Sequence, residues 1–458
     1  MKNITLEQIC IACGGTYYGP AENVQKCIEG ITVDSRKVKT GWLFAATVGA
    51  RVDGHSFIQD CYEKGVLCCL GEKEPVSENH SYIKVTSTFQ ALKDIAEYYR
   101  STLTIPIIGI TGSVGKTSTK EMIASVLKEK FHTLKTEGNF NNELGVPLTV
   151  FHIQKEHEAA VLEMGISNFG EMHRLSKIVR PNICVMTNIG FCHLEFLGDR
   201  DGVLKAKSEI FDFAAEGAKA ILNGDDDKLR TLKDRPDLDC MFFGMDPSND
   251  VYAENVENLG LDGLTCDIVT PKGTFSAHIS IPGVHMVHNA LAGTCVGLVC
   301  GLTLAEIKSG IENAQTISGR NHIIHTADYT IMDDCYNANP VSMKASLDVL
   351  SSALGRKVAI LGDMGELGEK ERALHRSVGE YAAQKQIDLL LCVGTLSEEM
   401  INGAKSVNPN MNAFLFSTKE ELLDKLPKLL KKGDSILIKA SHFMQFDTIV
   451  KELEDEKC

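Results

Sequence analysis

A glycine-containing loop at residues 111–117, with the sequence TGSVGKT, carries the strongest chemical signal in the chain. It follows an apolar run at 107–110 and precedes an amphipathic helical pattern, which is the context of a phosphate-binding loop. Lys116 could reach the β- and γ-phosphates of a nucleotide, and the Thr117 hydroxyl could bind Mg²⁺. Ile110 stands where the full eight-residue motif has glycine, so a turn without function is the alternative. The flanking strand and helix favour nucleotide binding.

Three further candidates accompany the next two apolar runs. Glu163 closes the run at 159–164, where a carboxylate could hold Mg²⁺, although a solvated or capping glutamate is the ordinary alternative. His193 follows the run at 183–186, and a lone histidine is more often structural. Lys207 lies in a helical pattern and would ordinarily be a surface lysine; near a metal it makes sense only in modified or displaced form, because an ammonium repels a dication. The carboxyl ends of parallel strands share one edge, so the loop, Glu163 and His193 could converge there.

Weaker candidates lie later in the chain. Asn289 is in the segment that opens a glycine-striped helix, Arg320 follows it, and residues 333–340 (DDCYNANP) follow an apolar run. An asparagine can read an adenine edge, an arginine can cover phosphate charge, and an aspartate can hold ribose hydroxyls. Helix caps and turns are the ordinary alternative for each of them.

Alternating strand and helix patterns must position these residues. After about 102 residues of mixed short patterns, buried-strand candidates separated by helices indicate an α/β protein with parallel sheets covered on both faces. A second alternating set after about residue 316 indicates a further α/β domain. The expected strands lie at 107–110, 159–164, 183–186 and 220–222 in the first set, and at 330–332, 358–361, 389–393 and 435–438 in the second.

Composition narrows the class of protein. The chain has 458 residues and a formal net charge of −14, which disfavours broad binding to nucleic acids or anionic membranes. Glu7 interrupts the apolar start, so no signal peptide is expected. The apolar stretch at 290–305 is shorter than the roughly 20 residues that span a bilayer, and a buried helix packed closely on a sheet is expected instead.

The cysteines indicate the compartment. Their number, 15, is odd, which favours reduced thiols in the cytoplasm over a disulfide framework. Cys10 and Cys13 are spaced like half of a zinc site, but no second pair with that spacing follows, so a structural zinc is not expected.

Together these residues resemble the Mur ligase superfamily of ATP-dependent amide-forming enzymes, and within it most resemble the UDP-N-acetylmuramoyl-tripeptide–D-alanyl-D-alanine ligases. Segments 32–36 (TVDSR) and 53–57 (DGHSF) are similar to the family's uridine-substrate domain, and 138–142 (GNFNN) to its catalytic core. Segments 336–343 (YNANPVSM) and 361–368 (LGDMGELG) look like marks of this branch. The sister branch that adds a diamino acid usually has a D-N-P-R motif in its last domain, and this sequence has none.

The resemblance implies three α/β domains: a small UDP-MurNAc-peptide-binding domain (1–102), a central P-loop ATP-binding domain with a parallel sheet (103–316), and a dinucleotide-fold-like C-terminal domain (317–458). The last would bind D-alanyl-D-alanine and part of the nucleotide. It also implies the reaction: the terminal carboxylate of UDP-MurNAc-tripeptide takes the γ-phosphoryl group of ATP, and the amine of D-alanyl-D-alanine attacks the acyl phosphate. The product is the UDP-MurNAc-pentapeptide of cytoplasmic peptidoglycan synthesis. A monomer without stable membrane insertion is expected.

The resemblance further implies residue roles. Lys116 and two Mg²⁺ would offset the negative charge of the nucleotide phosphates and the substrate carboxylate. Thr117 and Glu163 would bind one ion, and His193 would bind the other. Lys207, carbamylated by CO₂, would help position the second ion. The nucleotide would contact Thr111, Gly112, Ser113, Val114, Gly115, Lys116, Thr117, Ser118, Asn289, Arg320 and Asp334, and the substrates would contact Ser35, Arg36, Asn139, Asn141, Asn142, Tyr336, Asn337 and Asn339. Met286 stands where the family often has asparagine, so Asn289 would act without that neighbour.

Two alternatives remain open. Another amide ligase of the superfamily would add glutamate or a diamino acid instead. A nucleotide-binding switch or adaptor would hydrolyse nucleotide slowly without any UDP-sugar, and His193 and Lys207 would then be dispensable. Such a switch needs no second set of metal ligands.

Overall fold

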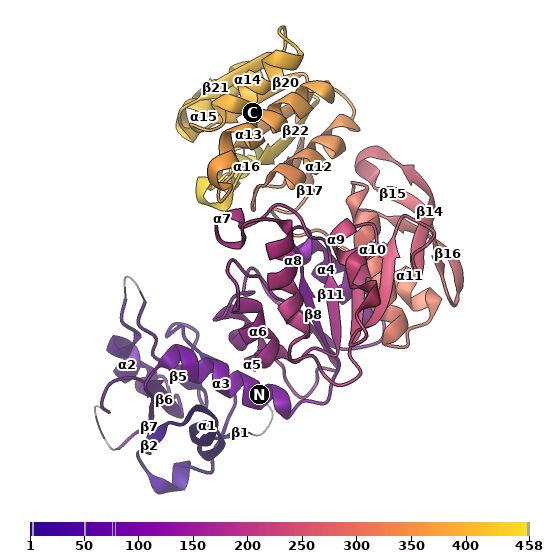
Figure 1. Ribbon diagram of the computed structural model, residues 1–458. Helices are drawn as coiled ribbons and strands as arrows, with labels where there is room; N and C mark the ends of the chain where they lie inside the picture. The colour runs from indigo at the N-terminus through magenta and orange to yellow at the C-terminus, as the bar shows by residue number, and fades with distance from the viewer. Residues whose placement is uncertain (2–3, 50–51, 76, 78, 456–458) are drawn as a thin grey trace. The chain divides into compact units, whose positions relative to one another are not determined.

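The computed structural model describes residues 1, 4–49, 52–75, 77 and 79–455. Its internal contacts divide the chain into two compact units (Figure 1). Unit 1 comprises Met1–Thr111, Lys130–Val185 and Ala206–Ala220, and unit 2 comprises Gly112–Glu129, Met186–Lys205 and Ile221–Cys458. Each unit is an α/β structure, as the sequence predicts. The boundaries of the three predicted domains stay a prediction.

The N-terminal part of unit 1 is built on a five-stranded sheet, in which β2 is antiparallel to β7 and the other neighbours are parallel. The strand that begins at Ile31 ends after Thr32, because the Thr32 hydroxyl and the Asp34 carboxylate accept backbone N–H groups and form a turn. The strands in sheet order are β2 (Thr16–Tyr18), β7 (Ser81–Lys84), β6 (Cys68–Gly71), β5 (Leu43–Ala45) and β4 (Ile31–Thr32). Beside them lie the pair β1 (Ile4–Thr5) and β3 (Cys27–Ile28), and the helices α1 (Leu6–Cys13), α2 (Ile58–Glu63) and α3 (Thr88–Ser101).

The largest sheet has nine strands in the order β16-β15-β14-β13-β12-β11-β8-β10-β9. Its unit 1 strands confirm the predicted apolar runs, and β10 is parallel to both β8 and β9. Every residue of β8, β10 and β11 is buried, as expected for strands covered on both faces. The elements of this part are β8 (Ile107–Thr111), β9 (Thr133–Lys135), β10 (Ala159–Glu163), β11 (Ile183–Met186), α5 (Gly145–Phe151), α6 (Glu171–Val179) and α8 (Arg200–Ser208).

The unit 2 part of this sheet corrects the expectation of parallel strands alone. After β12 (Lys219–Asn223) and β13 (Asp239–Gly244), the chain forms an antiparallel meander of β14 (Val251–Asn258), β15 (Leu264–Thr270) and β16 (Gly273–Ile279). Buried and half-exposed residues alternate along β15, and this period of two is typical of a sheet with one covered face. The sequence holds this signal in Leu264, Cys266 and Ile268, which share one face of β15.

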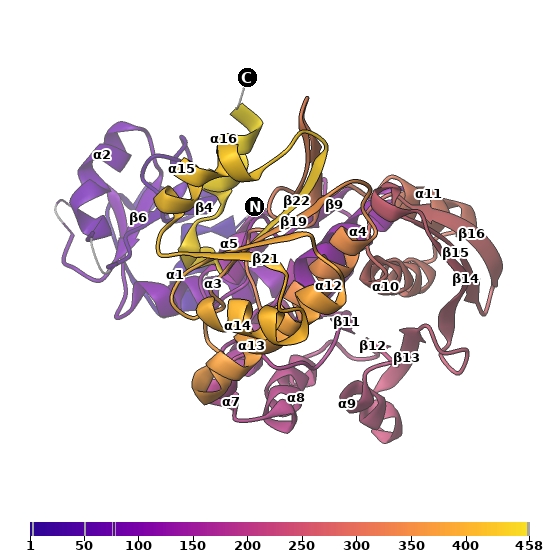
Figure 2. The same ribbon diagram turned by 90° about the horizontal axis from the view of Figure 1, so that it is seen from above.

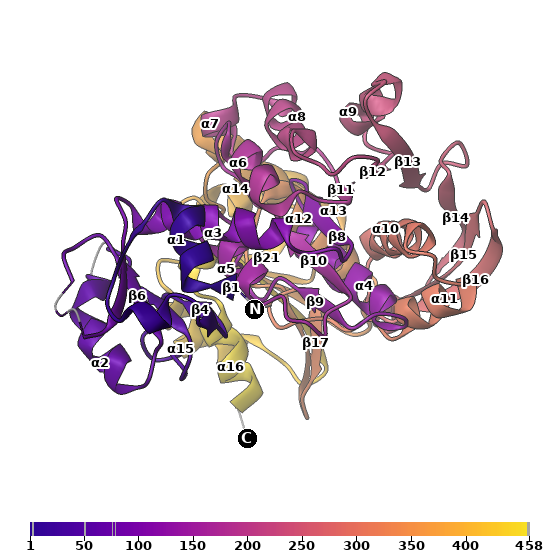
Figure 3. The same ribbon diagram turned by 90° about the horizontal axis from the view of Figure 1, so that it is seen from below.

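The glycine-striped segment forms the buried helix α10 (His285–Val299), which ends six residues before the apolar stretch does, where Gly301 adopts φ +74°. The sequence predicts that this helix packs on a sheet, but the structure shows a second packing partner. α10 also packs on α4 (Lys116–Lys128), since a Cβ on Gly297 would lie 3.0 Å from Val126 Cγ1. Figure 3 shows α10 and α11 (Leu304–Glu312) beside the antiparallel strands. Within the described ranges, no helix has both the length and the apolar character needed to cross a membrane.

The C-terminal part of unit 2 is a six-stranded sheet that confirms all four predicted strands and adds one at each edge. Only the edge strand β17 is antiparallel to its neighbour. Two apolar cores cover opposite faces, one under α12, α13 and α14 and the other under α15 and α16 (Figure 2). The strands in order are β17 (His322–His325), β18 (Tyr329–Asp333), β22 (Asp434–Lys439), β19 (Lys357–Gly362), β20 (Leu389–Val393) and β21 (Asn412–Phe416). The helices are α12 (Pro340–Ser351), α13 (Glu371–Gln384), α14 (Glu398–Val407), α15 (Lys419–Leu429) and α16 (Asp447–Asp455).

A partly exposed carboxylate, Asp225, ties α10 to the loops of the large sheet. Asp225 accepts hydrogen bonds from His288 Nε2 at 2.8 Å, Met245 N at 2.6 Å and Asn249 Nδ2 at 3.1 Å. Burial by itself raises the pKa of Asp225, but the hydrogen bonds from His288 and from two backbone N–H groups outweigh it and lower this pKa to about 2. The ionised carboxylate therefore stabilises the fold.

We expect Asp225→Ala to lower the melting temperature by the equivalent of about 1–3 kcal/mol at pH 7, because it leaves several donors without their acceptor. The folded pKa is depressed, so this stabilisation is fully present above the unfolded pKa of about 4 and is lost as the pH falls towards 2. Calorimetry of wild type and variant at pH 7 and pH 3 should show the difference shrinking at pH 3. The exposed Asp227→Ala is the matched control; an equal loss in both variants would contradict a special role for Asp225.

Candidate active site

The phosphate loop joins β8 to α4, and its glycines are required by the backbone. Gly112 has φ +151°, and a Cβ there would lie 1.9 Å from Thr187 Oγ1. Gly115 has φ +81° and is the N-cap residue directly before α4. A side chain at Gly112 would therefore clash, and one at Gly115 would be strained. This is the geometry that the sequence pattern predicts.

The segment after β11 holds the loop in shape. Asn188 accepts from Ser113 N through its backbone oxygen and from Val114 N through Oδ1, both at 3.0 Å, and its Nδ2 donates to Val114 O at 3.0 Å. Thr187 Oγ1 donates to the same carbonyl oxygen at 2.6 Å. Sequence reasoning assigned no role to Asn188, although its place directly after a buried strand was a signal. Two loop N–H groups are thus committed to Asn188.

The two chemically active side chains of the loop start α4. Lys116 is half-buried, and its Nζ donates to Gly112 O at 2.9 Å, so the ammonium lies over the loop itself. The Thr117 side chain is almost fully buried in the first turn of α4. An ammonium, a hydroxyl and a helix N-terminus in one place suit a polyphosphate and its counterion.

His193 is held next to this loop by its neighbour in the chain. Cys192 Sγ lies 3.1 Å from Ser113 Oγ, which also accepts from Gly190 N at 2.8 Å. His193 itself has φ +50° and precedes α7 (Leu194–Leu197). Its Nδ1 is buried and lies 3.0 Å from Glu366 Oε2. Unit 2 therefore contains the phosphate loop, His193 and a glutamate that sequence reasoning did not single out.

Unit 1 brings together Glu163 and one of the predicted substrate residues. Glu163 is 2% exposed at the end of β10, in register with Ile110 of β8. Its Oε1 accepts from Asn141 Nδ2 at 2.9 Å. Asn142 instead contacts the start of α5, since its Oδ1 accepts from Gly145 N at 2.8 Å, and Asn139 is exposed. Glu163 is thus a positioned carboxylate rather than a solvated one.

The remaining predicted residues of unit 1 differ in burial. Lys207 lies near the end of α8 and is 1% exposed, so the alternative of a surface lysine is wrong. Ser35 and Arg36 occupy the turn after β4, where Arg36 forms an ion pair of 2.9 Å with Asp34 and is 87% exposed. This arginine lowers the pKa of Asp34 to about 2 through its side-chain hydrogen bonds.

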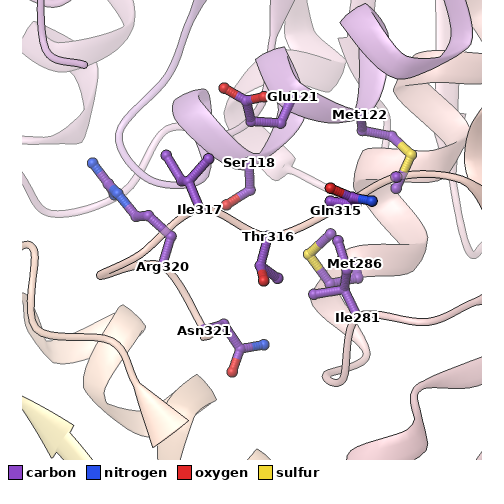
Figure 4. Close-up of a pocket in the computed structure, with 11 residues that line it drawn as sticks. Ser118, Glu121, Met122, Ile281, Met286, Gln315, Thr316, Ile317, Arg320 and Asn321 are labelled. Carbon is purple, nitrogen blue, oxygen red and sulfur yellow. The ribbon is translucent and has the colours of Figure 1, made fainter. Parts of the chain in front are cut away.

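A pocket lies between α4, α10 and the segment that follows α11 (Figure 4). Met122, Ile281 and Met286 form its apolar wall, and the polar residues Glu121 and Asn321 line it on opposite sides. Apolar walls with a few polar groups suit a flat heterocycle such as a nucleobase.

Asn289 does not line the pocket that the structure shows. Its Oδ1 accepts from Thr119 Oγ1 at 2.8 Å, and its Nδ2 donates to Met286 Sδ at 3.1 Å, so Met286 faces the pocket in its place. Sequence reasoning missed Glu121 and Asn321. Glu121 lies one turn after Thr117 on α4, and this spacing was the available signal.

Two successive carboxylates hold the pocket residue Arg320. Asp333 Oδ2 accepts from Gly319 N at 2.6 Å, and Asp334 Oδ1 accepts from Asn321 N at 3.1 Å. Gly319 and Asn321 both have positive φ, so the turn between them is tightly constrained. The Arg320 guanidinium lies 3.9 Å from the centre of the Tyr336 ring, a stacking distance.

The other predicted residues of this region have local partners. Asp334 Oδ2 accepts from the buried Lys439 at 2.5 Å and from Ser346 Oγ at 2.6 Å, so both of its oxygens are engaged. Asn339 caps α12 by accepting from Ser342 N, and exposed Asn337 accepts from Ala338 N. Sequence reasoning missed Lys439, which directly follows the predicted strand 435–438 and is the last residue of β22.

Each of the two units has a buried oxygen donor of the kind that magnesium prefers. Mg²⁺ prefers oxygen ligands and takes one or two carboxylates together with substrate phosphates and water. A buried Glu163 carboxylate and the Thr117 hydroxyl are donors of this kind. The part of the chain that the structure describes has no cluster of three or more His, Cys, Asp or Glu side chains able to hold a metal without such help.

Comparisons with known proteins cover all parts of the chain. Three family models match: "Mur ligase family, catalytic domain" at residues 27–103, "Mur ligase middle domain" at 110–297, and "Mur ligase, glutamate ligase domain" at 319–442. The UDP-N-acetylmuramoyl-tripeptide–D-alanyl-D-alanine ligase of Bacillus subtilis is 35% identical over 454 residues, covering 98% of both chains. That of Escherichia coli is 32% identical and covers 99% of both.

Solved structures agree with the sequence relatives. A crystal structure of MurF from Acinetobacter baumannii superposes with a TM-score of 0.88 at 32% identity and covers 99% of both chains. MurF ligase from Thermotoga maritima, solved in complex with ADP, has a TM-score of 0.82 at 29% identity and covers 93% of this chain and 97% of its own. The chain belongs to the Mur ligase family, in the branch of the UDP-N-acetylmuramoyl-tripeptide–D-alanyl-D-alanine ligases.

Proposed function

We propose that this protein is an ATP-dependent ligase that joins D-alanyl-D-alanine to UDP-MurNAc-tripeptide, giving UDP-MurNAc-pentapeptide, ADP and phosphate. The observation that carries the proposal is similarity over the full length to ligases of that name, at 32–35% identity. The phosphate loop, with its strand before and its helix after, supplies the nucleotide chemistry that such a reaction needs.

The reaction turns a poor electrophile into a good one. A carboxylate oxygen of the tripeptide attacks the γ-phosphorus of ATP, and the bond to the β-phosphate oxygen breaks, which releases ADP. The amine of D-alanyl-D-alanine then attacks the acyl carbon, and the tetrahedral intermediate expels phosphate while the nitrogen loses a proton. Lys116 and the N-terminus of α4 offset the charge on the transferred group. Mg²⁺, when bound, supplies further positive charge to the phosphates.

The metal ligands follow from the family resemblance together with the local environment of each residue. Thr117 and Glu163 would hold one Mg²⁺, and both side chains are buried oxygen donors. His193 would bind the second ion. Lys207, deprotonated to the neutral amine, would add to CO₂ and lose a further proton to give a carbamate, which replaces a buried cation with an anion that would help position the second ion. Arg320 and the pocket of Figure 4 receive the nucleotide base and its phosphates.

Each of the three predicted domains binds a different substrate or part of one. Residues 1–102 bind the uridine nucleotide of the acceptor, with Ser35 and Arg36 on the surface turn of that part. Residues 317–458 receive the dipeptide near Tyr336. The protein acts in the cytoplasm, where ATP and UDP-linked precursors are available, and as a monomer.

The identity of the amine tests the proposal most directly. Incubation with ATP, UDP-MurNAc-tripeptide and one amine at a time should release phosphate and give a new amide by mass spectrometry with D-alanyl-D-alanine, and not with D-glutamate or diaminopimelate. Acceptance of a single amino acid in place of the dipeptide would assign a sister activity. Phosphate release that needs no UDP-sugar and forms no amide would instead indicate a nucleotide-binding switch.

A further inference from the structure

We propose that Glu366 is a positioning residue for His193: its carboxylate holds the imidazole in the tautomer that carries hydrogen on Nδ1 and leaves Nε2 to bind the metal. The inference rests on the proposed role of His193 as a Mg²⁺ ligand. It adds a residue from the C-terminal sheet to a site otherwise built from loops of the large sheet.

The two side chains lie close together. His193 Nδ1 is at an ion-pair distance of 3.0 Å from Glu366 Oε2, and this shielded nitrogen makes no aligned hydrogen bond within the part of the chain that the structure describes. The two residues are 173 positions apart, one in the segment matched by the middle-domain model and the other in the segment matched by the glutamate-ligase-domain model. Both belong to unit 2. The contact therefore links two parts of the family's architecture.

The loop that carries Glu366 is anchored on both sides. Asp363 Oδ1 accepts from Ser397 N at 2.7 Å, Met364 N donates to His375 Nε2 at 2.9 Å, and Gly365 N donates to Ser441 Oγ at 2.9 Å. Three successive residues are thus tied to three other elements. Glu366 comes next with φ +60°, a conformation that a residue with a side chain adopts only when its surroundings enforce it.

His193 shows the same combination of anchoring and strain. Its φ is +50°, and its carbonyl oxygen accepts from Leu197 N at 2.9 Å in the first turn of α7. The preceding Cys192 contacts the phosphate loop through Ser113. Two left-handed residues from distant loops meet through their side chains, and each such conformation is energetically costly. Strain of this kind is characteristic of functional sites.

The chemistry of imidazole explains what the contact does. A neutral histidine carries hydrogen on one nitrogen only, and a metal binds the other. Metal-binding histidines commonly donate the remaining N–H to a carboxylate, which fixes the tautomer and the ring orientation. Glu366 accepts and cannot donate when ionised, so it favours hydrogen on Nδ1. A carboxylate also makes the ring a stronger ligand than a neutral acceptor would.

The tautomer of His193 tests the inference without metal or turnover. In protein with ¹⁵N-labelled histidine at pH 8, long-range ¹H–¹⁵N spectra should show His193 with hydrogen on Nδ1, the signal being assigned by its loss in His193→Gln. Glu366→Ala should move His193 to the other tautomer, while Glu369→Ala, an exposed glutamate in the same loop region, should not. An unchanged tautomer in Glu366→Ala would overturn the proposal, even if that variant were less active.

Metal binding gives a second readout. Titration with Mn²⁺ in the presence of a non-hydrolysable ATP analogue, followed by electron paramagnetic resonance, should show the second ion binding about 10- to 100-fold more weakly in Glu366→Ala and less weakened in Glu366→Gln. Glu369→Ala should match wild type. Equal Mn²⁺ affinity in all four proteins would contradict the proposal. If the wild-type protein made no pentapeptide but the differences in Mn²⁺ affinity remained, the proposed function would be refuted and the role of Glu366 would stand.

Discussion

Lys116→Ala is expected to lower the rate of acyl-phosphate formation by about 10³-fold or more, because the ammonium offsets charge on the phosphoryl group as it is transferred. Lys116 is the charged side chain of the loop, and its Nζ lies over Gly112 O at 2.9 Å. The loss should appear in kcat as well as in kcat/KM, since the interaction strengthens in the transition state. Phosphate release and pentapeptide formation, followed in the same samples, provide the measurement.

The control for this variant lies on the same helix. Lys128 is exposed in the last turn of α4, so Lys128→Ala removes the same charge without touching the loop. It should retain full activity. Lys116→Ala should also keep the melting temperature of wild type, which separates a loss of chemistry from a loss of fold. Retained turnover in Lys116→Ala would remove the phosphate loop from the proposed reaction.

The second large effect is expected for Lys207→Ala, with roughly 100-fold loss of activity that short-chain carboxylic acids partly restore. Lys207 is 1% exposed, so its replacement by alanine leaves a cavity in which a small carboxylate can stand for the carbamate. Activity measured against acetate, propionate and formate concentration should rise to a plateau. The plateau should differ among the acids according to how well each fills the cavity.

Lys205→Ala is the matched control, because Lys205 is an exposed lysine on the same helix. It should lose little activity and should not respond to added acids. Full loss in Lys207→Ala without rescue by any acid would leave Lys207 a structural residue. Mass spectrometry of wild type under CO₂, with the lysine trapped by alkylation, tests for the carbamate directly.

Much of the fold could be predicted from local pattern. Runs such as 107–110 and Leu389–Val393 are free of charged and polar side chains because both faces of a parallel strand are covered, and the structure confirms them within β8 and β20. The meander β14–β16 was missed although β15 alternates with a period of two. Its first strand is irregular, since a bulge shifts the register between Glu254 and Glu257 and breaks the pattern.

Part of the candidate site could likewise be predicted from local sequence pattern, and part could not. The glycines of the phosphate loop could be predicted because Gly112 and Gly115 adopt positive φ angles, and the backbone conformation of a tight loop is a local property. The contacts of Asn188 with that loop and of Glu366 with His193 could not be predicted. Asn188 follows a predicted strand and Glu366 lies in the segment 361–368, but their roles depend on which distant groups they face.

The sequence by itself determined the alternation of buried strands and helices, the phosphate loop and the membership of a family, because these depend on side-chain type at short spacing and on similarity along the chain. Only the tertiary structure decided that Lys207 is buried, that Met286 rather than Asn289 faces the pocket, and that Glu366 meets His193. Burial and pairing arise when segments far apart in sequence pack together. Residue type alone does not specify burial or pairing, since a lysine or a glutamate in the sequence can lie either on the surface or in a buried active site.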